Sequence, residues 1–242
     1  MEQNKTAKYF KYATGEILLV MVGILLALQV NNWNQQRIAF NQEQVLLKIL
    51  KNDFDNRLKE LEQLNAGRKD GIKALDELMS LTNNLPKNYD AKRIDSLLVL
   101  ATVTYRFNNQ FSALDMLFNS GRINSLSNDS LKGLLTNWPN LVEEMIEEQN
   151  LVVDNYKEIV KVLDKYISLR DVFQNFTWRY HNIPQMKPSK LEKDYNGLVN
   201  DRSFENVLAT KRFLLSINIV DSDLIIDDSK KIIEILEQEI KN

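Results

Sequence analysis

Cysteine is absent from this chain of 242 residues, and histidine is nearly absent, since His181 is the only one. Without a thiol the chain forms no disulfide, no lipoprotein anchor, no thiolate metal site and no cysteine nucleophile. A single histidine also leaves zinc, copper and di-iron sites without the ligands that they need. We therefore expect no metal and no cofactor, and we expect His181 to be an ordinary loop residue.

Glycine and proline are also scarce, with seven and four residues. So few helix breakers favour long helices over a strand-rich fold with many tight turns. The net charge is only −2, which gives nucleic acid no basic face to bind. A glycine-rich phosphate loop and a dinucleotide fingerprint are missing as well. The expected fold class is all-α, without nucleic-acid binding and without enzymatic activity.

An unbroken apolar run, ILLVMVGILLAL, extends from Ile17 to Leu28. A helix needs about 20 residues to cross the hydrocarbon core of a membrane, and the span reaches that length when it includes Tyr12 to Val30 and continues to Trp33. Aromatic residues at both ends suit the two membrane interfaces. The sequence therefore predicts a tail (residues 1–11), a transmembrane helix in the lipid bilayer (12–33) and a soluble domain (34–242).

Positive charge is distributed unevenly around this span. Lys5, Lys8 and Lys11 precede it, whereas Arg37 alone lies directly beyond it. Basic flanks stay on the cytoplasmic side of a membrane, so the N-terminus is expected in the cytoplasm and the domain outside it. A cleaved signal peptide is the alternative, but the residues LALQVNNWN that end the run contain no small-residue cleavage pair.

Small residues line part of the span. Gly23 and Ala27 are four positions apart, and Gly15 lies on nearly the same face. Such residues let a second helix approach closely, so we predict a protein partner or a second copy of the chain at this face; the alternative is that they only reflect ordinary membrane-helix composition. Glu16 is the one ionisable residue near membrane depth, and it is either functional or a carboxylate at the headgroup level.

Two stretches of sequence resemble an uncharacterised family of single-span membrane proteins from Bacteroidota. The first contains Gly15-Glu16-Ile17 and then GILLALQVNNWN from Gly23 to Asn34. The second is Ser120-Gly121-Arg122-Ile123 followed by LSNDSL from Leu126 to Leu131. The resemblance implies an inner-membrane protein whose domain lies in the periplasm, and it supplies no catalytic residues. Asp95-Ser96-Leu97 and Asp129-Ser130-Leu131 also resemble the O-glycosylation acceptor pattern of Bacteroidota.

Apolar residues recur at helical spacing through the rest of the chain. The membrane helix is expected to continue into the domain, where Asn83 to Pro86 end it. The segment Phe111–Leu135 is expected to be a helical hairpin, in which Ser120-Gly121 suits a helix C-cap and Ser127 or Asn128 suits a helix N-cap. The predicted architecture is an antiparallel bundle of helical segments at Leu47–Met79, Ile94–Tyr105, Phe111–Leu135 (a hairpin), Asn140–Phe173 and Ser203–Ile240.

Two side-chain clusters in the domain are candidate binding sites. An aromatic loop predicts a partner-binding surface, because tryptophan, tyrosine and arginine dominate interface hot spots; the alternative is a loop packed over the bundle end. An acidic patch could bind a cation, but such a patch is more often a solvated helix face or the edge of an interface. The loop residues are Phe176, Trp178, Arg179 and Tyr180; the patch residues are Glu143, Glu144, Glu147 and Glu148.

The sequence therefore favours a membrane-anchored interaction or scaffold protein without catalytic activity. A ligand-binding sensor module is the second hypothesis, and it needs a partner subunit because the cytoplasmic tail is too short for an output domain. A hydrolase that uses paired carboxylates is a third, although no pairing is evident from spacing.

Overall fold

The computed structural model describes residues 3–108, 110–174 and 186–241, and all of their regular structure is helical. The prediction of an all-α fold is therefore confirmed for these residues. The first helix, α1, has 78 residues. The elements in chain order are α1 (Gln3–Ser80), α2 (Ala91–Thr102), α3 (Ser112–Asn119), η1 (Arg122–Ser125), α4 (Asp129–Leu163), α5 (Leu169–Phe173), α6 (Tyr195–Val199) and α7 (Arg202–Glu239).

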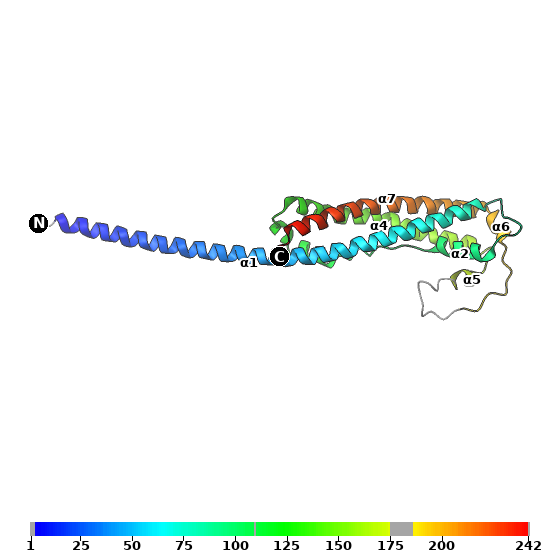
Figure 1. The fold of residues 1–242 in the computed structure, drawn as a ribbon, viewed down its shortest axis with the longest axis horizontal. Coiled ribbons are helices and arrows are strands. Elements are labelled where there is room, and N and C mark those ends of the chain that lie inside the picture. The colour runs from blue at the N-terminus through cyan, green and yellow to red at the C-terminus, as the bar shows by residue number, and fades with distance from the viewer. Residues whose placement is uncertain (1–2, 109, 175–185, 242) are drawn as a thin grey trace.

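The molecule is a rod in which α1 extends far beyond a bundle that occupies the other end (Figure 1). Helix α1 alone, among the described helices, is long and apolar enough to cross a membrane. All its large apolar side chains from Ile17 to Val30 are exposed. Residues 15–42 are exposed except for the half-buried Asn34, and the second half of α1 then becomes one side of the bundle.

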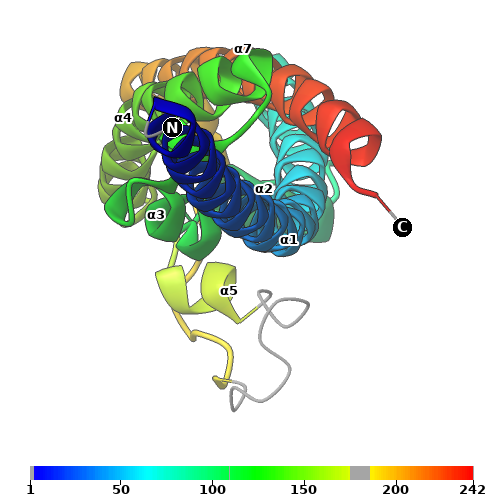
Figure 2. The same cartoon turned by 90° about the vertical axis from the view of Figure 1, so that its left-hand side faces the viewer.

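The bundle has four segments, which we call its legs. Two of them run away from the exposed part of α1, and two (the descending legs) run back toward it. The second half of α1 and α4 run away from the exposed segment of α1, and α7 runs back between them (Figures 1 and 2). At one end Gln44 donates to the carbonyl of Glu239 at 3.0 Å, and towards the other Arg212 forms an ion pair with Asp76 at 2.5 Å. Helix α2 and the extended residues after it form the other descending leg. We call the end at Asp76 the distal end.

The helix ends follow from local sequence. The Asn128 side chain caps α4 by accepting a hydrogen bond from the amide of Leu131 at 3.0 Å. Ser120 is the C-cap of α3, and it is followed by Gly121, whose φ is +69°. Both caps were predicted. Asp90 and Asp201 cap α2 and α7 in the same way as Asn128, because a short side-chain oxygen satisfies amides that lack a helical acceptor.

Three helix limits differ from the predicted ones. Helix α4 runs without interruption through Pro139, whereas the sequence suggested one helix ending at Leu135 and another starting at Asn140. Packing of α4 against α7 outweighs the one hydrogen bond that proline removes. Helix α2 ends at Thr102 because Val103 is extended, with ψ at 136°. A turn separates α4 from the short α5, so that the predicted helix to Phe173 is two helices.

Two apolar clusters fill the bundle. The cluster nearer the exposed part of α1 contains three rings that meet at centroid distances of 4.8 to 5.3 Å: Phe54 from α1, Phe111 before α3 and Trp138 from α4. The distal cluster joins α1, α2, α4 and α7 around Leu75 and Leu208. Each cluster packs one face of α1, which is why its apolar residues recur at three- and four-residue intervals.

Tyr105 lies against α1 at two glycines between these clusters. A Cβ atom at Gly67 would lie 2.3 Å from Cε1 of Tyr105, and one at Gly71 would lie 3.6 Å from Cε2. The ring therefore requires glycine at position 67, whereas a Cβ atom at position 71 would make an ordinary van der Waals contact. A side chain at position 67 would separate the extended leg from α1.

We predict that Gly67→Ala lowers the free energy of unfolding by about 1–2 kcal/mol, because the Tyr105 ring must leave its site. Gly133→Ala in α4 is the matched control: no atom lies within 4 Å of its Cβ position, so alanine should raise stability by about 0.5–1 kcal/mol through helix propensity. Denaturant unfolding of the full chain in detergent micelles measures both. Equal effects at the two positions would contradict the close packing of Tyr105.

Candidate functional site

The four candidate residues of the predicted membrane span lie on an exposed part of α1. Gly15 and Gly23 have no atom within 4 Å of their Cβ positions, so space for a neighbouring helix exists at both. Glu16, Gly23 and Ala27 lie on one face by helical geometry, and Gly15 lies beside it. Nothing within the described chain covers this face, and its pairing with another helix stays a prediction.

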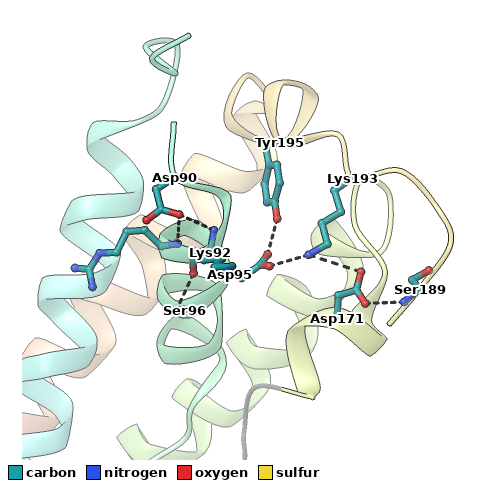
Figure 3. A network of polar contacts seen from close by, with 9 residues as sticks. Asp90, Lys92, Asp95, Ser96, Asp171, Ser189, Lys193 and Tyr195 are labelled. Atoms are coloured by element: carbon teal, nitrogen blue, oxygen red, sulfur yellow. Dashed lines mark hydrogen bonds and ion pairs between the residues drawn. The ribbon is translucent and has the colours of Figure 1, made fainter. Parts of the chain in front are cut away.

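The predicted partner-binding residues Phe176, Trp178, Arg179 and Tyr180 lie outside the described residues, as does His181. The structure does describe how the flanking segments attach to the bundle. Asp95 of α2 accepts the hydroxyl of Tyr195 at 2.6 Å and the ammonium of Lys193 at 2.7 Å. Figure 3 shows these side chains converging at the distal end.

Asp171 of α5 extends this network to the segment before the loop. Its Oδ2 lies 3.7 Å from the Lys193 ammonium, and its Oδ1 accepts the amide of Ser189 at 2.8 Å. Burial, and then the hydrogen bond to Asp95, raise the pKa of the Tyr195 hydroxyl, so Tyr195 remains a donor at any physiological pH. We call Asp95, Asp171, Lys193 and Tyr195 the distal clamp, since they join α5 and the segment that leads into α6 to α2.

A belt of buried polar side chains crosses the bundle between the two apolar clusters and extends into the distal one. Buried polar groups need hydrogen-bond partners, because an unpaired one loses its water without compensation. The belt therefore constrains how the helices fit together. Its members are Asn65 and Arg68 from α1, Thr102 from α2, Gln149 and Asn155 from α4, and Lys211, Asn218 and Ser222 from α7.

Arg68 is the belt residue with the most hydrogen-bond donors to satisfy, and its side chain has no exposed surface. Its Nη1 donates to Oδ1 of Asn65 at 2.8 Å and to the hydroxyl of Ser222. Its Nε and Nη2 are buried and have no hydrogen-bond acceptor among the described residues; Oδ2 of Asp221 is likewise buried without a donor. Burial lowers the pKa of Arg68 to about 10, against the opposing charges of Asp221 and Asp223. The guanidinium remains charged at neutral pH.

Lys211 is the second fully buried cation. Its ammonium donates to the carbonyl of Val103 at 2.9 Å, at the point where α2 ends. Burial lowers the pKa of Lys211 to about 7, because the charged form loses its hydration. Lys211 thus ties α7 to the extended leg, and its charge changes near neutral pH.

The acidic patch of α4 divides between two directions. Glu144 and Glu148 face α7, where their charges add to burial in raising the pKa of Asp221. Glu143 and Glu147 instead border a hollow beside α3. In the described part of the chain, no three acidic or histidine side chains are placed to hold a metal ion. Ser96 and Ser130, the hydroxyls of the two predicted glycosylation patterns, lie at solvent-accessible positions.

The burial of Arg68 and Lys211 was not predicted from the sequence, although the spacing of both residues indicates it. Arg68 lies four residues before Ile72 and four after Leu64, in the apolar stripe of α1. Lys211 lies three residues after Leu208 and four before Leu215 in the stripe of α7. A charge at a core position of an amphipathic helix indicates a buried polar contact.

The fold defines a class of protein: a bundle of four mainly helical segments, one of which is the second half of a long helix with an apolar N-terminal segment. The chain belongs to a family of unknown function, DUF6090, whose model matches residues 16–177. The match begins at Glu16, includes nearly all of both stretches that suggested the resemblance, and ends before α7. No curated protein and no solved structure matches the chain.

Lys211 predicts a specific pH dependence of stability. Its pKa is about 7 in the folded protein against an ordinary 10.5. Between these values the unfolded chain binds the additional proton, so the free energy of unfolding rises with pH by up to about 1.4 kcal/mol per unit. We expect Lys211→Met to remove this slope and to be more stable than the parent at neutral pH, with the difference shrinking toward pH 10.5.

Denaturant unfolding of the full chain at a series of pH values measures this difference. Lys73→Met is the control, since Lys73 is largely exposed and pairs with Asp70. If parent and Lys211→Met give parallel stability curves between about pH 7 and pH 10.5, Lys211 does not lose its charge on burial.

Proposed function

We propose that this chain is a membrane-anchored interaction protein, in which α1 both spans a lipid bilayer and pairs with a second protein helix. The observation that carries the proposal is the exposure of α1: residues 15–42 are uncovered, apart from the half-buried Asn34, while the same helix is packed from Leu46 onward. A bilayer accounts for the exposed apolar run as far as Val30. It does not account for the apolar side chains that α1 exposes beyond Trp33.

The stalk, residues 34–45, lies beyond the proposed span. Twelve helical residues in water are marginally stable on their own, and this stretch also exposes Ile38, Phe40 and Val45 at 46%, 40% and 60%. Ile17, Ile24, Ile38 and Val45 fall into one register of seven residues, with Asn31 at the remaining position. β-Branched residues at every seventh position with a single asparagine match one of the two core positions of a parallel two-stranded coiled coil. A second copy of the chain therefore fits this face best.

The opposite side of the stalk faces the bundle. Phe40 lies under the ammonium of Lys241, 5.4 Å from the ring centroid, and helical geometry places Gln36 and Glu43 near the same side. Glu43 accepts the amide of Ser127 at 2.8 Å. The face that carries Ile38 and Val45 is therefore directed away from the bundle, where a partner helix has access.

We further propose an inner-membrane location with the N-terminus in the cytoplasm and the bundle in the periplasm. The lysines at positions 5, 8 and 11 support this orientation, because basic residues are retained on the cytoplasmic side. In this arrangement the distal clamp lies far from the membrane, where a soluble partner reaches it.

A sensor module that acts through a partner subunit is the second proposal, and the polar belt favours it. Arg68 offers an unpaired Nε and Nη2 edge, which is the side of a guanidinium that binds carboxylates with two hydrogen bonds. Arg68 also lies on α1, the helix that continues into the proposed span. Thermal unfolding of the full chain with a panel of small carboxylates tests this idea; the absence of any stabilisation would remove it.

The pairing of α1 is testable because the chain has no cysteine. We predict that single cysteines placed along the stalk form disulfide-linked dimers in native membranes, with the greatest yield at Ile38→Cys and Val45→Cys. Gln36→Cys is the control, because it lies nearly opposite Ile38 on the helix. Equal yields at all three positions, or none above background, would contradict a specific pair of stalk helices.

A further inference from the structure

A hollow of about 430 Å³ lies where α3 meets α4. Its floor includes Phe111, Trp138 and Val142, and its rim carries three carboxylates, Asp115, Glu143 and Glu147. We call this hollow the acidic groove. The groove thus combines an apolar floor with a rim of three negatively charged side chains. An ordinary solvated helix face differs, because polar side chains cover it.

Among the described residues, no cation forms an ion pair with the three rim carboxylates. Some exposed acids elsewhere on α4 do pair with a lysine three residues further on, as in Asp154–Lys157 and Glu158–Lys161. On the rim no described residue donates a hydrogen bond or an ion pair to Asp115, Glu143 or Glu147.

The sequence around the groove explains this lack of cations. Helix α4 contains no lysine or arginine between Lys132 and Lys157, and none occurs between Arg106 and Arg122. Arg57, whose guanidinium lies 5.9 Å from the Phe111 ring, is paired with Glu60. The negative charge of the rim is therefore uncompensated within the described chain.

Pro139 leaves one carbonyl of α4 without its usual helical donor. Because proline has no amide hydrogen, the carbonyl of Leu135 receives no bond from residue 139 inside α4. Pro139 also lines the groove. The groove thus offers three carboxylates and an apolar floor to one ligand.

We infer that the acidic groove binds a basic amphipathic segment of a partner protein, with apolar side chains over Trp138 and lysine or arginine side chains at the rim. This inference rests on the proposed function as an interaction protein. Lysine and arginine suit the site because their aliphatic stems cover apolar surface while their charged ends reach outward.

Other ligands fit less well. A metal ion gains nothing from an apolar floor, and nucleic acid is repelled by the rim. The position of the groove excludes a lipid headgroup: Phe54, which packs on Phe111 at 4.8 Å, lies 21 residues along α1 from Trp33, or about 32 Å of helix.

Trp138 provides the readout. The chain has three tryptophans, and Trp33→Phe with Trp178→Phe leaves Trp138 alone. The full chain is placed in phosphatidylcholine nanodiscs and titrated with a labelled helical peptide of leucine and lysine, of about 18 residues. We expect one peptide per chain, a change in Trp138 emission, and weaker binding at higher salt. A leucine–glutamate peptide of the same pattern should not bind.

The decisive comparison uses two variants with the same change in charge. Asp115→Asn/Glu143→Gln/Glu147→Gln should weaken the lysine peptide about tenfold or more. The control Glu205→Gln/Asp227→Asn/Glu234→Gln, at positions on α7 away from the groove, should change it less than about twofold. Equal weakening in both variants, no effect of the rim variant, or no binding to the parent would overturn the inference. The disulfide test of the stalk has an independent outcome, so failure here leaves the proposed pairing of α1 standing.

Discussion

The structure depends on the unbroken hydrogen-bond ladder of α1. Inside a bilayer every backbone amide and carbonyl must be satisfied within the helix, and no glycine or proline interrupts α1 between Gly23 and Gly67. One helix therefore supplies the apolar segment, the stalk and one leg of the bundle. Any rotation of the apolar segment about its axis turns the bundle with it, so a partner that pairs with α1 also determines how the distal end is presented.

The belt fixes the other helices to α1. Arg68 contacts Ser222 of α7, and Lys211 of α7 contacts the carbonyl of Val103 beyond α2. Apolar clusters alone tolerate sliding along a helix, whereas buried polar contacts are satisfied in one register only. The unpaired edge of Arg68 shows that this register leaves one strong donor group without an acceptor among the described residues.

Local sequence predicted the features that depend on neighbours in the chain. The stripes of α1 and α7, the stop near Asn83 and the Asn128 cap follow from residues a few positions apart. The continuity of α4 through Pro139 depends instead on its packing against α7. The belt and the acidic groove depend on which helices meet, since Arg68 resembles an interruption of a stripe until Ser222 is placed beside it. The groove was not predicted from the sequence because only half of the predicted acidic patch, Glu143 and Glu147, belongs to it.

The most direct test of a continuous α1 is a distance measurement along the helix. Spin labels at Gln35 and Gln63, in full-length protein diluted with unlabelled chain in nanodiscs, lie 28 residues apart on α1. A continuous helix predicts one narrow distribution near 42 Å, at about 1.5 Å per residue. A broad distribution, or one centred well below that distance, would show that the stalk bends or unwinds, and the bundle would then be tethered to the membrane segment without a fixed orientation.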